Sequence, residues 1–112
     1  MSGGRVDPAV AWRAASGAVL LVTGAPPPVS AGVLRGGERS ERSAAWRRQL
    51  AIYTAAVSLN VGVKPLVAHV GVSRAMVRKI LRELEDRRGE VGVDELLELL
   101  GREASRRMEL AA

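Results

Sequence analysis

The sequence contains no cysteine and no phenylalanine, and its aromatic residues amount to only 3% of the chain. Without cysteine, neither a disulfide framework nor a thiolate metal site can form, as is typical of proteins in a reducing cytoplasm. Long apolar runs are also missing, because the longest, residues 18–22, is too short to cross a bilayer. No signal-peptide cleavage pattern follows that run. We therefore expect a cytoplasmic protein with no membrane partner.

Hydrophobic residues nevertheless make up 47% of the 112 residues, which is enough for the core of one domain. With so few aromatic residues, this core must consist of Leu, Val, Ile and Ala. The sequence shows no strand-like alternation of apolar and polar residues and no internal repeat. These features predict an all-α fold, a small helical bundle.

Residues 1–42 differ from the rest, since they contain seven of the twelve glycines and four of the five prolines. Asp7-Pro8 is typical of a helix start, and a short helix from Ala9 to about Ser16, stopped by Gly17, could follow. Residues 24–43 have no period and are interpreted as a linker. We expect a flexible arm that lies loosely on the domain or is disordered. Alternatively, it folds on a partner such as RNA polymerase or another DNA-bound regulator.

Residues 43–110 have helical periodicity and are predicted to form the domain itself. Ser43 can cap a helix that reaches Leu59, with one apolar face formed by Trp46, Leu50, Tyr53 and Val57. Two further helices are expected over residues 65–70 and 73–88, separated by Gly71. A fourth helix is expected to be capped by Asp94, with its apolar stripe at Val93, Leu96, Leu97, Leu100 and Ala104. Gly101 could end or interrupt this helix, and the tail to Ala112 is expected to fray.

The stretch from Lys64 to Leu84 has the spacing of a helix-turn-helix, in which two helices cross steeply at a tight turn. Gly71 supplies the left-handed turn position and Val72 fills the corner. The inward residues are predicted to be Leu66 and Val70 before the turn and Val77 and Ile80 after it. Ser73 is then the cap of the second helix, which would be the recognition helix in the DNA major groove.

Charge supports this interpretation. The net charge is +5, and residues 74–82 include four basic residues and no acidic one. Arg74, Ala75 and Arg78 are the candidates for contact with base edges, and Lys79 and Arg82 for contact with phosphate. Arg47-Arg48, near the expected start of the first long helix, oppose its dipole and are candidates for phosphate or minor-groove contact. The predicted DNA-binding residues are Arg47, Arg48, Lys64, Ser73, Arg74, Ala75, Arg78, Lys79 and Arg82.

No pattern in the sequence indicates an enzyme. His69 is the only histidine, and Ser73 has no base near it in the sequence. There is no phosphate-binding loop, glycine-rich dinucleotide turn or paired-carboxylate signature. We expect no catalytic residues, cofactor, metal or small-molecule substrate.

A series of short segments resembles the C-terminal DNA-binding domain of the replication initiator DnaA, as found in short stand-alone relatives in alphaproteobacteria. These segments are residues 48–53, Asn60, the stretch 64–84, residues 84–88 and residues 94–97. The resemblance implies a Trp-repressor-like bundle with a recognition helix in the major groove and Arg47 or Arg48 in the minor groove. Where that family has Asp-His-Thr-Thr, this chain has Ser-Arg-Ala-Met at residues 73–76. The resemblance therefore does not predict binding to the DnaA box.

The sequence thus predicts a DNA-binding transcription regulator, specifically an activator, that associates with the nucleoid. The relatives of this type include replication regulators and activators of gene transfer agent clusters. Replication control through the same domain is therefore one alternative. The other is a protein-interaction module without DNA binding, in which Leu99, Leu110 and the arm form the surface.

Overall fold

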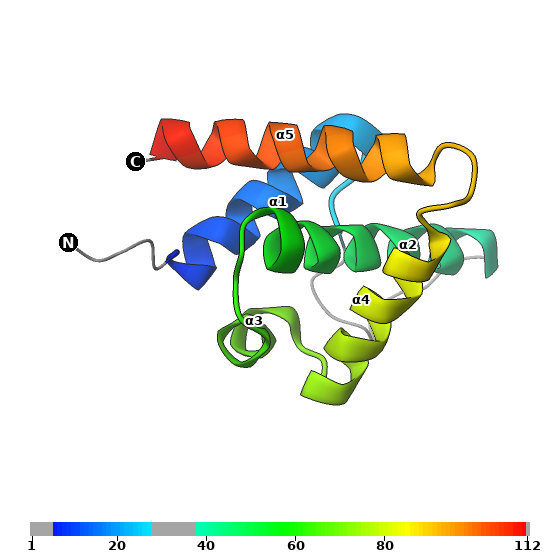
Figure 1. The fold of residues 1–112 in the computed structure, drawn as a ribbon, viewed down its shortest axis with the longest axis horizontal. Coiled ribbons are helices and arrows are strands. Elements are labelled where there is room, and N and C mark those ends of the chain that lie inside the picture. Colours follow the sequence, from blue (N-terminus) through cyan, green and yellow to red (C-terminus); the bar gives the residue numbers. More distant parts are fainter. Residues whose placement is uncertain (1–5, 28–37, 112) are drawn as a thin grey trace.

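Most of the residues that the computed structural model of this chain describes are helical (Figure 1). The described residues are 6–27 and 38–111, with side chains from Ser43 onward in the second segment. The helices are α1 (Pro8–Thr23), α2 (Glu38–Tyr53), the π-helix η1 (Thr54–Ser58), α3 (Val63–Val70), α4 (Arg74–Arg87) and α5 (Val93–Ala111). No strand occurs within these residues, so the all-α prediction is confirmed. None of the helices in this part of the chain is long and apolar enough to span a membrane.

The helix α1 is part of the core and is not a loose arm. As predicted, Asp7 Oδ1 accepts a hydrogen bond from the Ala9 N–H at 2.9 Å, and Pro8 opens the helix. The predicted stop at Gly17 is wrong, because α1 continues to Thr23 and ends at Gly24, where φ is 85°. One glycine costs a helix about 1 kcal/mol, and packing against α5 offsets this cost. The buried residues of α1 are Ala11, Ala14, Ala15, Ala18 and Val19.

This packing changes the domain boundaries. The expected division into an arm of residues 1–42 and a domain of residues 43–110 does not hold for α1, which shares one core with the helices that follow. The centre of the expected linker, residues 28–37, lies outside the described residues. From Glu38 the chain is already helical, so Ser43 lies within α2 and is not its cap. Residues 38–42 are Glu, Arg and Ser without an apolar period; Glu and Arg are good helix formers.

The π-helix η1 continues α2 directly after Tyr53. Its wider turn is closed by the hydrogen bond from the Leu59 N–H to the Thr54 carbonyl, 3.0 Å long. The extra residue in this turn rotates the side chains that follow it. Val57, which was predicted to face the core with Tyr53, is therefore 48% exposed, whereas Leu59 is buried. Asn60 then ends the helical segment with a φ of 63°.

The helices α3 and α4 are joined by three residues, Gly71, Val72 and Ser73. Gly71 adopts the predicted left-handed conformation, with a φ of 70°. The predicted inward residues Leu66, Val70, Val77 and Ile80 are all buried, and Val72 packs against the same core. The pair forms the lower part of the molecule in Figure 1, with α5 at the top.

The helix α5 is longer than predicted. It begins at Val93, so Asp94 lies in its first turn, and it runs through Gly101 to Ala111, the last residue that the structure describes. A Cβ atom on residue 101 would lie 2.7 Å from Ser58 Oγ, so glycine allows α5 and η1 to approach closely. Beyond this glycine, Ala104 is buried against the core. The predicted apolar stripe is confirmed, with Val93, Leu97 and Leu100 buried and Leu96 half-buried.

Candidate nucleic-acid interface

The exposed face of α4 contains most of the predicted DNA-binding residues. Ser73 caps the helix, and its Oγ accepts a hydrogen bond from the Met76 N–H at 3.1 Å. Val77, Ile80 and Leu84 anchor one side of the helix in the core. The predicted contact residues of α4 are all exposed: Arg74, Ala75, Arg78, Lys79 and Arg82. One side of the helix is therefore buried in the core, and the opposite side presents cations to solvent.

Few acidic groups neutralise this face. Lys79 Nζ lies 3.8 Å from Glu83 Oε1, and both side chains are more than half exposed, so this ion pair is weak. Arg74, Arg78 and Arg82 form no ion pair with any of the described residues. The sequence between Glu41 and Glu83 contains no Asp or Glu at all. A positive potential on this side of the molecule follows.

Lys64 lies outside α4. It is exposed in the first turn of α3, the helix that packs beside α4 in the lower part of the molecule (Figure 1). Lys64 and the cations of α4 thus belong to two packed helices, and all of them are exposed.

Arg47 and Arg48 lie in the interior of α2, ten or so residues from its start at Glu38. The expected position near a helix N-terminus is therefore wrong, and the dipole argument does not apply to them. Arg47 Nε donates a hydrogen bond to the Pro26 carbonyl at 3.0 Å. The neighbouring Trp46 ring lies under the guanidinium of Arg87, 4.7 Å from it, at the end of α4 farthest from Ser73. The structure does not bring these two arginines together with Arg74 and Arg78.

Arg48 is half-buried, and its Nε and Nη1 atoms are buried without a hydrogen-bond partner among the described residues. A buried donor that lacks a partner costs about 1–3 kcal/mol. We expect Arg48→Met, which keeps an unbranched apolar stem and removes the guanidinium group, to raise the free energy of unfolding measured in urea. The matched variant Arg47→Met should lower it slightly, because it removes the bond to Pro26. Equal destabilisation by both variants would contradict this interpretation of Arg48.

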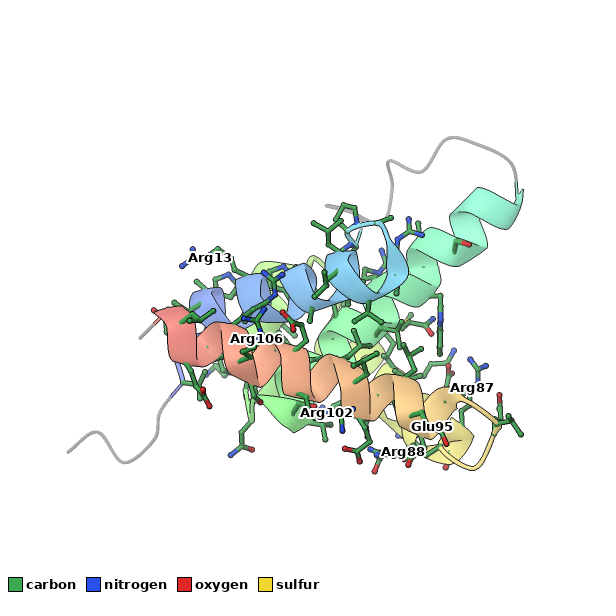
Figure 2. All side chains as sticks on the ribbon, turned by 90° about the horizontal axis from the view of Figure 1, so that it is seen from above. Arg13, Arg87, Arg88, Glu95, Arg102 and Arg106 are labelled. Carbon is green, nitrogen blue, oxygen red and sulfur yellow. The ribbon has the colours of Figure 1, made fainter. Side chains whose placement is uncertain are left out.

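Arg88 connects the end of α4 to α2 and α5. Its Nη1 donates to the Tyr53 hydroxyl at 2.7 Å, its Nε donates to Asp94 Oδ1 at 2.7 Å, and its Nη2 donates to Glu98 Oε1 at 3.1 Å. The Tyr53 hydroxyl in turn donates to the carboxylate of Glu85 on α4. Figure 2 shows Arg87 and Arg88 beside the start of α5. These contacts, together with the buried face of α4, hold that helix at a fixed angle to the bundle.

Tyr53, the only tyrosine of the sequence, reports on this network. Burial raises the pKa of its hydroxyl, and the hydrogen bond to Glu85 raises it further, against the opposing effect of Arg88. Because the pKa is raised in the folded state, the stabilisation is present below the ordinary tyrosine pKa and is lost as the pH rises through the folded value. We expect an ultraviolet titration to show ionisation above the ordinary value in the native protein and at that value in urea. The same midpoint in both would contradict the network.

Among the described residues, no group of three or more His, Cys, Asp or Glu side chains is close enough to hold a metal ion. His69 is exposed at the end of α3. Comparisons with family models, with curated proteins and with solved structures each gave no match. The function is therefore inferred from the residues of this chain.

Sequence reasoning missed two features of this region. Met76, in the first turn of α4, is 42% exposed within the basic face. The helical spacing places Met76 outside the buried stripe of Val77 and Ile80, and this spacing was a signal from which its exposure could have been predicted. The second is the arrangement around Arg88, which joins residues far apart in the sequence and has no local signal.

Proposed function

We propose that this chain binds double-stranded DNA sequence-specifically, with α3 and α4 as a helix-turn-helix and α4 in the major groove. The observation that carries the proposal is the exposed, acid-free basic face of α4 at residues 74–82. A major groove accepts one α-helix, and phosphates line both of its edges. A helix anchored on its opposite side and basic on its outer face meets both requirements.

Roles within this face follow from the position of each residue. The first turn of a recognition helix lies closest to the base pairs, so Arg74 and Arg78 are assigned to base edges, where arginine favours guanine. Ala75 is small and allows a close approach. Lys79 and Arg82, farther along, are assigned to phosphates, and Ser73 and Lys64 to the flanking backbone. The acidic residues that begin at Glu83 mark where the contact ends.

Arg47 and Arg48 are left out of this contact. Arg47 is engaged by Pro26, and two of the Arg48 nitrogens are buried. The minor-groove role that the DnaA resemblance implies for one of them has no support from its surroundings.

Regulation of transcription, as an activator on the nucleoid, is the process that we propose for this domain. The DnaA resemblance, which the comparisons leave without support, keeps replication control as the alternative. A genome-wide map of bound sites separates the two, because a regulator of transcription occupies promoters and a regulator of replication occupies the origin.

A protein-binding role is favoured by a different observation. Several large apolar side chains of α1 and α5 are exposed, among them Leu20, Leu21, Leu99 and Leu110. In Figure 1, α5 lies at the top of the molecule, opposite the α3–α4 pair, and α1 packs against both α5 and α3. A partner such as RNA polymerase could therefore be contacted while α4 occupies DNA.

Selection from a random duplex library tests the proposal. The full chain is expected to enrich a defined sequence whose length matches the part of one major groove that a single helix can contact. It should bind that sequence about 10³-fold or more tightly than unrelated DNA at the same salt concentration. Enrichment of no sequence, with equal binding to every duplex, would contradict sequence-specific recognition.

A further inference from the structure

An exposed methionine stands in the middle of an otherwise basic surface. The Met76 side chain is 42% exposed in the first turn of α4. It is not among the apolar side chains that pack against the core, unlike its neighbour Val77. Packing within this chain therefore does not account for a large apolar side chain at this position.

Ala75 adds a second apolar group beside it. With 3.6 residues per turn, Ala75 lies opposite the buried stripe of Val77, Ile80 and Leu84 and thus near the centre of the exposed face. Ala75 and Met76 are consecutive exposed residues about 100° apart around the helix. Together they are called the apolar spot, and Arg74, Arg78 and Lys79 lie in the same two turns. This spot lies in the turn that approaches a bound duplex most closely.

The chemistry of the major groove identifies what such a spot contacts. Base edges in this groove present hydrogen-bond donors and acceptors, and the 5-methyl group of thymine is their apolar feature. We propose that Ala75 and Met76 contact thymine methyl groups, so that the recognised sequence combines thymine with the guanines assigned to Arg74 and Arg78. This inference rests on the proposed function and names the bases that the same site reads.

Replacing thymine by deoxyuridine tests the inference, because it removes only the methyl group. In the sequence selected by the full chain, each thymine is replaced in turn and the affinity is measured. We expect a loss of about fourfold at one or two adjacent positions, as for the burial of one methyl group. For one of these positions, the Met76→Ser variant should bind the duplex with thymine and the duplex with deoxyuridine with equal affinity. Val91→Ser, in the loop before α5, removes a fully exposed valine and is the matched control, which should keep the fourfold difference.

The outcomes separate this inference from the proposed function. Selection of a sequence whose thymines all tolerate deoxyuridine would overturn the thymine contact and leave DNA binding intact. A fourfold difference that persists in Met76→Ser would likewise overturn the role of Met76. Failure to bind any duplex would overturn the proposed function, and the inference with it.

Discussion

A protein that starts at Ser43 is expected to lose cooperative thermal unfolding, because α1 is an integral part of the core. Truncation removes Val19 and four buried alanines and exposes the face of α5 against which they pack. A single large-to-small change in a core costs about 2–5 kcal/mol, and small domains have a total stability of about 5–15 kcal/mol. The loss of a whole packed helix therefore exceeds what the remaining helices can offset.

Two controls make this result specific. A protein that starts at Val6 keeps α1 and should melt like the full chain. On α1 itself, Ala18→Asp places a charge at a fully buried position and should abolish the melting transition, whereas Leu21→Asp, at a position 60% exposed, should be tolerated. A sharp transition for the protein that starts at Ser43 would show instead that α1 is dispensable.

Loss of Arg78 is expected to have the largest effect on DNA binding. We expect Arg78→Ala to weaken binding to the selected sequence by about 1–3 kcal/mol, or about five- to 150-fold, and to relax the preference at one or two base pairs. Because Arg78 is exposed and unpaired among the described residues, the stability of the fold should change by no more than about 0.5 kcal/mol.

Arg102→Ala is the matched control, since it removes the same charge from an exposed position on α5 (Figure 2). In Figure 1 this helix lies on the opposite side of the molecule from the start of α4. Equal losses for both variants would indicate that net charge alone governs the binding. Unchanged affinity of Arg78→Ala would show that this residue does not contact a base.

The predictability of this fold from its sequence depended on the kind of residue at each core position. In α4, Val77, Ile80 and Leu84 stand out from charged neighbours, and Ser73 marks the start, so both the helix and its buried side were predictable. In α1 the inward face is mostly alanine, which is common on both exposed and buried surfaces of helices. The expected loose arm was therefore wrong for this helix, whose burial depends on α5, more than seventy positions later in the sequence.

The candidate site shows the same limit. Exposure of the α4 cations follows from their spacing relative to the buried stripe and could be predicted. The burial of the Arg48 nitrogens and the exposure of Val57 could not, because they depend on the packing around α2 and on the π-helix that follows it. Such shifts of register have no clear local pattern in the sequence.

The central claim, that α4 enters the major groove, is tested most directly by dimethyl sulfate methylation of guanine N7 on the selected duplex. Guanine N7 lies in the major groove and is an acceptor for arginine. We predict that the bound full chain protects guanines on one face of the duplex and that Arg78→Ala removes the protection of at least one of them. Unchanged N7 reactivity at full occupancy, with protection confined to adenine N3 in the minor groove, would contradict the account.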